Sequence, residues 1–426
     1  MLKETPIRTL INTPHAATHK SPTTPQHRAR ALRGGDPIFH PAAREILGLL
    51  QACARARKYV RVKCRARGGR EYCLYRYTTP DWRPFYTHPC LAYARGTLVI
   101  DGAWLVLAFT KFFNAGETPD TALERLPERP RLACEKLDGT MVAMWRDPYT
   151  GELTGHTRGL LPWEPPPGTT AFRGNPYVAR LLEYARENRL HTTLDTIVGD
   201  REVAIFELVV PGLPASRAAG RRETLAYARA SRERGQPYLL AVRSLEAMRL
   251  DPARGLWPLE PRCIEGETSR GLRRLASTAD HEGYVAWYER LGFTGPLSML
   301  DPLVKFKSWE YLLRVSGIQT SRGKIAYALR GGLDDLRPQL SEEEYGALAQ
   351  AVEEYQALQE LLQKASTMLP QAKAHGLRGW LLTAAQNPDK TLQLILENGP
   401  RKIGKLPGWL RAARRRLERV VEALED

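Results

Sequence analysis

Four lysines stand apart in a chain that otherwise carries its positive charge on arginine. The 63 basic residues divide into 14 lysines and 49 arginines, and between Arg65 and Arg322 the only lysines are Lys111, Lys136, Lys305 and Lys307. Arginine stays protonated, whereas a buried or cation-flanked lysine can lose its proton and act as a nucleophile. Codon bias in a GC-rich genome explains the scarcity of lysine but not these positions. We therefore expect the four lysines to serve chemistry.

Lys136 is the candidate nucleophile. It lies two residues before an Asp-Gly pair, in the stretch Glu135-Lys136-Leu137-Asp138-Gly139-Thr140. The pattern predicts a hairpin, with Leu132–Leu137 as one strand, Asp138-Gly139 as the turn and Met141–Trp145 as the return strand. We interpret Lys136 as an amine that attacks phosphorus or a carbonyl. The alternative is a surface hairpin with an incidental lysine.

The other three lysines occur in patterns that suit phosphate binding. Alternation along the short strand Val304–Ser308 sends Lys305 and Lys307 to one face. Two ammonium groups on one face repel each other unless an anion lies between them, and they could also depress the proton affinity of Lys136. Lys111 precedes Phe112 and Phe113, which is typical of a packed sheet edge but also of a cation beside a base-stacking aromatic.

Two acids begin or interrupt apolar strands. Glu207 lies within the buried strand Val203–Val210, where a carboxylate needs a partner. It either pairs with one of the many arginines or contacts a ribose or a metal ion. Glu282 stands at the start of the strand that continues to Trp287, and Arg158 follows another strand.

The composition favours a polyanionic partner. The 426 residues suffice for two or three domains, and the formal net charge is +16. Nucleic acid is the first candidate, because its phosphates supply salt-sensitive affinity for a basic protein. No apolar run reaches the roughly 18 residues of a membrane span, and no signal peptide opens the chain. We expect a soluble monomer in the cytoplasm of a bacterial or phage-infected cell.

The spacing of the cysteines does not indicate a disulfide framework. Six are present, without close CxxC pairing and too sparse for a disulfide scaffold in a chain of this size: Cys53, Cys64, Cys73, Cys90, Cys134 and Cys263. We expect reduced thiols and no structural zinc.

Three regions are predicted. Residues 1–36 form a disordered basic tail, residues 37–309 an α+β domain that contains all the motifs above, and residues 310–426 a helical domain. In the helical domain Ser341 is a predicted N-cap, with acids in the first turn after it. The last helix carries several arginines, which form either an RNA-facing ridge or a solvated face: Arg411, Arg414, Arg415 and Arg416.

Taken together, the motifs resemble those of the covalent nucleotidyltransferases, which comprise ATP-dependent RNA and DNA ligases and mRNA-capping guanylyltransferases. Four matches carry the resemblance: Lys136-Leu137-Asp138-Gly139, Phe206-Glu207 with Pro211 and Arg217, Glu282-Gly283-Tyr284-Val285, and Lys305-Phe306-Lys307-Ser308. Within this superfamily the chain is most similar to the RNA ligase 1 family of T-even phages, a tRNA-repairing type. The pointers are Lys111-Phe112-Phe113-Asn114, about 25 residues before Lys136, and Arg95-Gly96 before that.

The resemblance implies an antiparallel-sheet nucleotidyltransferase domain, an ATP-grasp-like ligase fold, followed by an all-helical domain. It also implies a phage-like RNA repair enzyme that uses ATP with Mg²⁺ or Mn²⁺ and forms a lysyl-AMP at Lys136. Lys305 and Lys307 would hold the α-phosphate, and Glu207 the ribose hydroxyls. Asp138 and Gly139 belong to the nucleotide-accepting motif, and Phe113 is our candidate for base stacking.

The remaining implied roles concern phosphates and metal ions. Arg95, Lys111 and Arg158 would contact the leaving phosphates of ATP or an RNA 5′-phosphate, and Glu282 would be the main acid near the metal. Asp334 and Asp335 could bind a second Mg²⁺, although an Asp pair at such a position also suits a helix N-cap. The substrate would be single-stranded RNA ends, with tRNA and single-stranded DNA as further candidates.

Two departures and three alternatives qualify the resemblance. The separation of Glu282 from Lys305, about 23 residues, predicts an insertion at Tyr288–Pro302, and the third motif lacks the Asn expected before Arg217. The alternatives are a DNA ligase, a capping-type guanylyltransferase and a basic RNA-binding protein with an inactive site. DNA ligases and capping enzymes carry a β-barrel after the fifth motif, and no alternating pattern of that kind follows Trp309.

Overall fold

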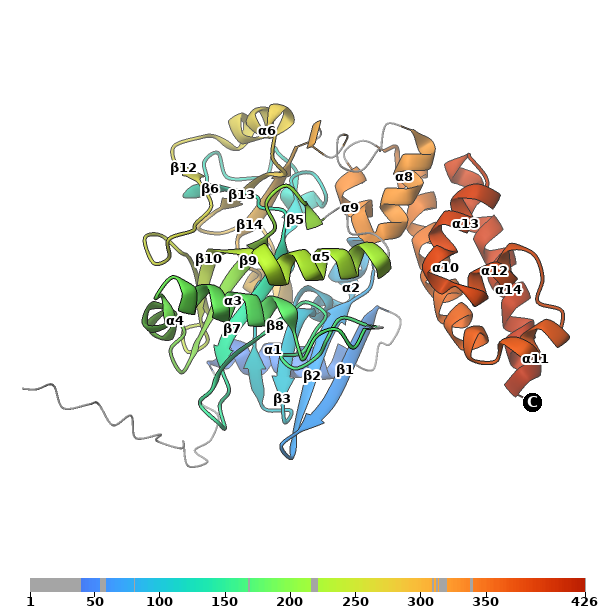
Figure 1. Cartoon of the computed structure of the whole chain (residues 1–426). Helices are drawn as coiled ribbons and strands as arrows, with labels where there is room; N and C mark the ends of the chain where they lie inside the picture. Colours follow the sequence, from blue (N-terminus) through green and yellow to red (C-terminus); the bar gives the residue numbers. More distant parts are fainter. Residues whose placement is uncertain are drawn as a thin grey trace, which may run out of the picture.

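A computed structural model describes residues 40–53, 59–79, 81–167, 169–215, 221–308, 310–311, 313, 320–337 and 340–425. The predicted tail at 1–36, Arg217 and Trp309 lie outside the described residues. Three β-sheets, antiparallel except for one strand pair, and their covering helices form one part of the molecule, and a group of helices lies to one side of them (Figure 1). The predicted order of an antiparallel-sheet region followed by helices is therefore confirmed.

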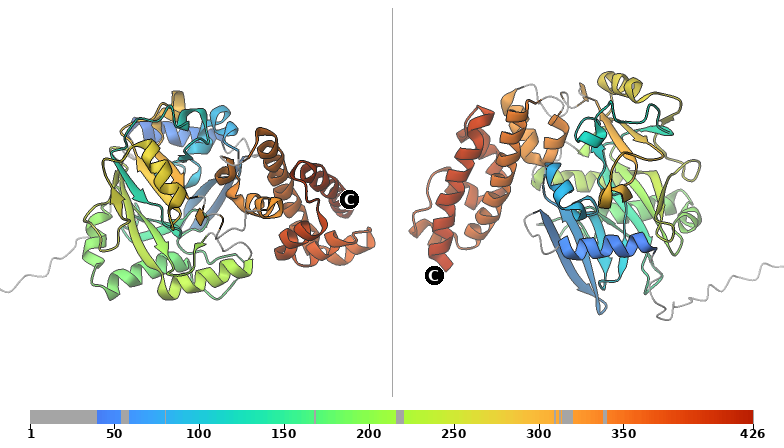
Figure 2. Two further views of the ribbon diagram at one scale, coloured as in Figure 1. Left: turned by 90° about the horizontal axis from the view of Figure 1, so that it is seen from above. Right: turned by 180° about the vertical axis from the view of Figure 1, so that it is seen from behind.

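The first sheet is a meander. Its order is β1-β2-β3-β4, all antiparallel, with β1 (Val60–Arg67), β2 (Arg70–Tyr77), β3 (Arg95–Ile100) and β4 (Trp104–Val106). Cys73 and Tyr75 face α1 (Pro41–Cys53), while Tyr72 and Leu74 face the other sheets, as period-two alternation requires. Seen from behind, α1 lies across this sheet (Figure 2). A short helix α2 (Arg83–Thr87) connects β2 to β3.

The second sheet carries Glu207. Its order is β11-β10-β9-β7-β8, with β7 (Thr140–Arg146), β8 (Leu153–Thr157), β9 (Glu202–Val209), β10 (Gln236–Ser244) and β11 (Arg249–Pro252). Three helices pack on its outer face: α3 (Pro176–Glu187), α4 (His191–Ile197) and α5 (Arg221–Arg234). Asn175 caps α3 by accepting hydrogen bonds from the amides of Tyr177 and Val178.

The third sheet carries the other motifs. Its order is β12-β6-β13-β14-β5, with β5 (Phe113–Asn114), β6 (Leu132–Glu135), β12 (Cys263–Ile264), β13 (Gly283–Trp287) and β14 (Leu303–Lys307). Only the β14–β5 pair is parallel among these strands. Helix α6 (Ser269–Thr278) packs against β13 and β14.

The predicted hairpin around Lys136 is wrong. Strand β6 pairs with β12 and β13, whereas β7 pairs with β8 and β9 in a different sheet. The segment Lys136–Gly139 is the crossing between the two sheets. An Asp-Gly pair permits a sharp change of direction in either arrangement, so the local pattern did not distinguish a turn from a crossing.

The C-terminal region is helical throughout residues 320–337 and 340–425, and in the described part of the chain no strand comes after β14. Its helices are α8 (Ser321–Tyr327), α9 (Leu333–Leu336), α10 (Glu342–Thr367), α11 (Leu369–Ala374), α12 (Trp380–Gln386), α13 (Thr391–Asn398) and α14 (Leu406–Glu425). A π-helical turn at Ala328–Gly332 joins α8 to α9. Ser341 caps α10 in a capping box with Glu344, as predicted.

Two arginines of α14 hold it against α10. Glu354 of α10 accepts from Arg411 Nε at 2.9 Å and from Arg414 Nε at 2.7 Å. These cations therefore contribute to helix packing, and neither a free RNA-facing ridge nor a purely solvated face describes them. No helix in the described ranges has the length and apolar character that a membrane span requires.

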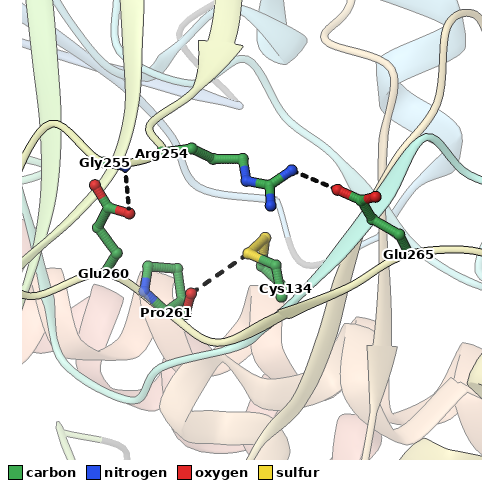
Figure 3. Close-up of a disulfide and its surroundings, with 7 residues drawn as sticks. Cys134, Arg254, Gly255, Glu260, Pro261 and Glu265 are labelled. Carbon is green, nitrogen blue, oxygen red and sulfur yellow. Dashed lines mark hydrogen bonds and ion pairs between the residues drawn. A yellow bond between two sulfur atoms is a disulfide. The ribbon is translucent and has the colours of Figure 1, made fainter. Parts of the chain in front are cut away.

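The prediction of reduced cysteines is wrong. All six are paired, as Cys53–Cys90, Cys64–Cys73 and Cys134–Cys263. Cys134–Cys263 joins β6 to β12 beside a loop that Glu260 stabilises by accepting from the Gly255 amide (Figure 3). Pairs separated by up to 129 residues leave no local spacing pattern to find in the sequence.

Candidate active site

A cavity of about 460 Å³ lies where the three sheets meet, and we call it the central cavity. Its size is in the range of small-ligand sites. Motif residues on its wall are Lys136, Gly139 and Glu207, and the cations are Arg95 and Arg158. Aromatic and apolar side chains supply much of the rest, including Phe109, Phe112, Met141, Leu240, Val285 and Trp287.

Lys136 is fixed by the strand beside it. Its backbone amide donates to the Gly283 carbonyl at 2.8 Å, directly beyond the end of β6. Its Nζ donates to Glu282 Oε2 at 2.5 Å, and the other Glu282 oxygen lies 2.9 Å from Lys307 Nζ. The pairing of Gly283 with Lys307 across β13 and β14 sets this spacing. The predicted nucleophile, acid and second lysine thus form one continuous row of alternating charge.

Two motif glycines leave no room for a side chain. A Cβ on Gly139 would lie 2.5 Å from the Leu208 carbonyl oxygen, and one on Gly283 would lie 2.0 Å from the Phe306 carbonyl oxygen. Gly283 also has φ +120°, a conformation that other residues rarely adopt. The two glycines let β9 and β14 approach the segments that carry Lys136 and Glu282.

Glu207 holds the crossing in place. Its Oε1 accepts from the Gly139 amide at 3.1 Å. Burial raises the pKa of Glu207 to about 8, with Lys136 acting in the opposite direction. The carboxyl group is therefore mostly protonated at neutral pH and can donate as well as accept a hydrogen bond. In the part of the chain that the structure describes, the hydrogen-bond partner of Glu207 is the Gly139 backbone amide and not an arginine, contrary to the sequence-based alternative.

Lys111 and Lys305 contact the same carboxylate, that of Asp334. Lys111 Nζ donates to Glu117 at 3.0 Å and to Asp334 at 3.4 Å, and Lys305 Nζ lies 3.5 Å from the same Asp334 oxygen. Burial alone would lower the pKa of Lys111, but Glu117 and Asp334 outweigh it and raise the pKa. For Lys305 burial dominates and lowers the pKa. Glu117 is a site residue that none of the sequence motifs identified.

The predicted anion between the lysines of β14 is supplied by the chain itself. Asp335 accepts from Lys307 Nζ at 2.5 Å and from the Tyr327 hydroxyl at 2.7 Å, while Asp334 bridges Lys111 and Lys305. The N-cap interpretation of this Asp pair is wrong, because Gly332 is the N-cap of α9. Contacts between residues far apart in sequence decide their role.

Phe113 does not line the central cavity. It is fully buried in the core beside Phe85 and Phe293, so this position does not support the base-stacking role expected for it. Phe112 lines the cavity instead, with the Arg95 guanidinium 4.3 Å and Lys305 Nζ 5.7 Å from its ring centre. Phe112 lies just before β5 and Phe113 is its first residue, and the two neighbours lie in different surroundings. Alternation along β13 could have identified Trp287, two residues after Val285, as a second cavity residue.

The last two predicted residues lie near the cavity. Arg158 is exposed, lines the cavity and stacks over the Tyr77 ring at 4.7 Å. Asp138 accepts from the Tyr311 hydroxyl at 2.7 Å. The contact ties the crossing between the sheets to the start of the helical region.

The predicted insertion Tyr288–Pro302 has a structural role. Phe293, Leu297 and Leu300 pack in the same core as α1. Asp301, the penultimate residue of the insertion, accepts from Arg243 at 2.5 Å and from the Thr110 amide at 2.7 Å, and all three residues are buried. This buried ion pair fixes the chain immediately before Lys111 and before β14.

Comparisons with known proteins add little. No family model and no curated protein matches the chain. It is similar to an archaeal ATP-dependent RNA ligase (16% identity, 74% of this chain and 79% of that chain, TM-score 0.39) and to a putative ATP-dependent DNA ligase from Aquifex aeolicus (14%, 87% and 76%, 0.33). It is also similar to a lysine-to-alanine variant of the Naegleria gruberi RNA ligase with ATP and Mn (14%, 49% and 58%, 0.31). Similarities this weak leave the function to be inferred from the site itself.

Proposed function

We propose that the chain is an ATP-dependent RNA ligase that works through a lysyl-AMP at Lys136. The observation that carries the proposal is the row Lys136–Glu282–Lys307, which starts at the wall of a cavity of nucleotide size, where Lys136 lies. A surface hairpin with an incidental lysine would have neither the cavity nor the partners. The narrower likeness to the phage RNA ligase 1 family, and a role in tRNA repair, belong to this proposal.

The central cavity suits a nucleotide. Its aromatic and apolar wall would hold the base, and Glu207, whose carboxyl group is protonated near neutral pH, would bind the ribose hydroxyls. Arg95, Lys111 and Arg158 would contact the β- and γ-phosphates or the RNA 5′-phosphate, with Lys305 and Lys307 at the α-phosphate. Gly139 lines the cavity, and its backbone amide donates to Glu207. Asp138 would hold the crossing in position through its hydrogen bond with the Tyr311 hydroxyl.

The chemistry is phosphoryl transfer in three steps. In the first, Lys136 Nζ forms a bond to the α-phosphorus of ATP, the bond from that phosphorus to the bridging oxygen breaks, and pyrophosphate leaves. The AMP then passes to the RNA 5′-phosphate, and a 3′-hydroxyl displaces it to form the phosphodiester. Attack requires the neutral amine. The contact between Lys136 and Glu282 must therefore break when the nucleotide binds, so that the amine can lose its proton.

A divalent cation fits the carboxylates near the phosphate-binding lysines. Glu282, Asp334 and Asp335 offer the hard oxygen ligands that Mg²⁺ and Mn²⁺ prefer. Among the described residues, the acids do not form a ready cluster of three, since the sole such group is Cys64, Glu71 and Cys73, two of which share a disulfide. This suits an ion held by one or two carboxylates together with substrate phosphates. When bound, the ion would offset the charge of the triphosphate.

The helical region after the fifth motif favours RNA over DNA as the substrate. Residues 320–337 and 340–425 are helical, and DNA ligases and capping enzymes carry a β-barrel at this point. A capping enzyme would also use GTP. The non-enzyme alternative, an RNA-binding protein with an inactive site, does not account for the pairing of Lys136 with Glu282.

Ligation of a 5′-phosphorylated single-stranded RNA tests the proposal. We expect ATP and Mg²⁺ to convert the labelled 5′-phosphate into a form that resists phosphatase, and Lys136→Arg to abolish the reaction. Lys324, a half-buried lysine of α8 outside the site, provides the matched control Lys324→Arg, which should retain activity. Sealing of DNA in preference to RNA would overturn the RNA assignment, and unchanged activity of Lys136→Arg would overturn the mechanism.

A further inference from the structure

A second hollow, larger than the central cavity, opens beside it. This outer groove has a volume of about 720 Å³ and lies between the β1–β2 strands and helix α10. Arg158 and Gly159 line both hollows, so the two meet at these residues. Figure 1 shows the helical region standing beside β1 and β2, where the groove is formed.

The sheet side of the groove is a cluster of like charges. Arg61 and Arg76 are exposed on neighbouring strands, and Arg158 lies across from them. Although part of the Arg76 side chain is exposed, the protein around it removes much of its water; this desolvation first, and then the charges of Arg158 and Arg61, lower the pKa of Arg76. The three guanidinium groups therefore repel one another. An anion in the groove would relieve this repulsion.

An aromatic ring lies among these cations. Tyr77 lines the groove, with the Arg158 guanidinium 4.7 Å and Lys111 Nζ 5.9 Å from its ring centre. Burial would raise the pKa of Tyr77, but Arg158 and Lys111 outweigh it and lower the pKa. Cations combined with an aromatic face are characteristic of surfaces that bind single-stranded nucleic acid.

The helix side of the groove offers neutral hydrogen-bonding groups. Gln356, Gln359 and Gln363 of α10 recur at helical spacing and all line the groove. Gln356 Nε2 donates to the Thr78 carbonyl at 3.2 Å, which holds α10 to the end of β2. The glutamine amides can hydrogen-bond with sugars and bases, while the arginines of the opposite wall can bind phosphates. Two carboxylates also line the groove, Glu360 paired with Arg61 and Asp334 paired with Lys111, so the cations remain in excess.

We propose that the outer groove binds the single-stranded RNA segment adjoining the 5′-phosphate, with that phosphate at Arg158 where the groove meets the central cavity. The proposal rests on the proposed ligase function and specifies where its substrate lies. It assigns the backbone to Arg61 and Arg76 and the nucleosides to the glutamines of α10. The Arg76 guanidinium lies against Gly159, since a Cβ there would be 3.5 Å from Nη1, so the path to the cavity is continuous.

The test separates RNA binding from the first chemical step. Fluorescence anisotropy with a 3′-labelled, 5′-phosphorylated single-stranded RNA would compare the parent with Arg76→Ala, Gln359→Ala and the control Arg186→Ala. Arg186 is exposed on α3 and lines neither hollow. We expect Arg76→Ala to bind RNA roughly tenfold more weakly and to lower the slope of log affinity against log salt by about 0.7. Gln359→Ala should weaken binding without changing that slope, and Arg186→Ala should change neither quantity.

Formation of lysyl-AMP is the second readout. Arg76→Ala and Gln359→Ala should form it at the parental rate, which also shows that they fold. If both variants bind RNA as tightly as the parent, the RNA-binding role of the outer groove is overturned, while the ligase function stands. Equal weakening by Arg186→Ala would overturn it too, because the effect would then be one of overall charge. Failure of the parent itself to form the adduct would instead overturn the proposed function.

Discussion

At the residue scale, the site is a set of buried charges that exist because each has a partner. Lys111, Lys305 and Lys307 are largely buried, yet each contacts at least one carboxylate. An unpaired buried charge would be prohibitively costly. Substrate phosphates can replace these carboxylates as partners without exposing the lysines. The carboxylates of Asp334 and Asp335 come from the helical region, so they would stand in for the phosphates when no substrate is bound.

The two neighbouring phenylalanines should separate stability from nucleotide binding. Phe113→Ala removes a fully buried ring and should lower the free energy of unfolding by about 3–5 kcal/mol. Phe112→Leu keeps most of the volume and should cost less than about 1.5 kcal/mol, while weakening the apparent affinity for ATP. Denaturant unfolding and adenylylation at varied ATP concentration provide the two readouts. A larger effect of Phe113 than of Phe112 on ATP affinity in the folded fraction would contradict this placement.

The raised pKa of Glu207 predicts how stability depends on pH. The folded protein keeps this proton up to a pH of about 8, whereas the unfolded chain loses it near the ordinary value of 4.5. The folded state therefore binds more protons over this range, and Glu207 makes the protein less stable as the pH rises through it. Glu207→Gln should remove that part of the decline. Thermal melts from pH 5 to pH 9 that fall in parallel for parent and variant would refute the shifted pKa.

At the element scale, the functional residues are placed by contacts between sheets more than by the strands that carry them. The crossing at Lys136–Gly139 passes from the third sheet to the second, and β9 holds it through Glu207. The insertion before β14 packs against the first sheet. The geometry around Lys136, Glu282 and Glu207 therefore depends on packing among all three sheets.

The buried pair Arg243–Asp301 should be a sensitive point of this assembly. Arg243→Met leaves the Asp301 carboxylate buried without its cation and should cost about 3–5 kcal/mol. The exposed pair of Arg249 with Asp251 is the matched control, and Arg249→Ala should cost about 0–1 kcal/mol. Equilibrium unfolding in urea measures both. Equally small losses of unfolding free energy for the two variants would mean that the buried pair does not hold β10 to the residues just before β14.

The disulfides should contribute unequally. Cys134–Cys263 encloses 129 residues and Cys64–Cys73 only 9. In the chain-entropy view the longer loop stabilises more, by about 4–5 kcal/mol against about 3 kcal/mol or less. We expect Cys134→Ser with Cys263→Ser to lower the Tm more than Cys64→Ser with Cys73→Ser. The reverse order in calorimetry without reductant would contradict this, and counting thiols in the unfolded parent checks that all six cysteines are paired.

At the scale of the whole molecule, the helical region completes the site. Asp334 and Asp335 reach lysines on β14 and in the segment before β5, and Gln356 reaches the end of β2. Replacing the region by a β-barrel would remove both the acids and the outer groove.

The range of each interaction decides how well the sequence predicts it. The capping of α10 by Ser341 depends on neighbouring residues, and the structure agrees with that prediction. The Asp-Gly crossing, two of the three disulfides and the contacts of Asp334 with Lys111 and of Asp335 with Lys307 depend on partners tens to hundreds of residues away. Phe112 and Phe113 are neighbours in different surroundings, and β5 is too short for an alternating pattern to be recognised in the sequence.

Intact mass of the protein after incubation with ATP and Mg²⁺ tests the central claim most directly. Pre-bound AMP should first be stripped with pyrophosphate. The account predicts a gain of one AMP on the parent, no gain on Lys136→Ala, and no corresponding GMP adduct when GTP replaces ATP. An unmodified parent, or an equal gain on Lys136→Ala, would contradict covalent catalysis at Lys136.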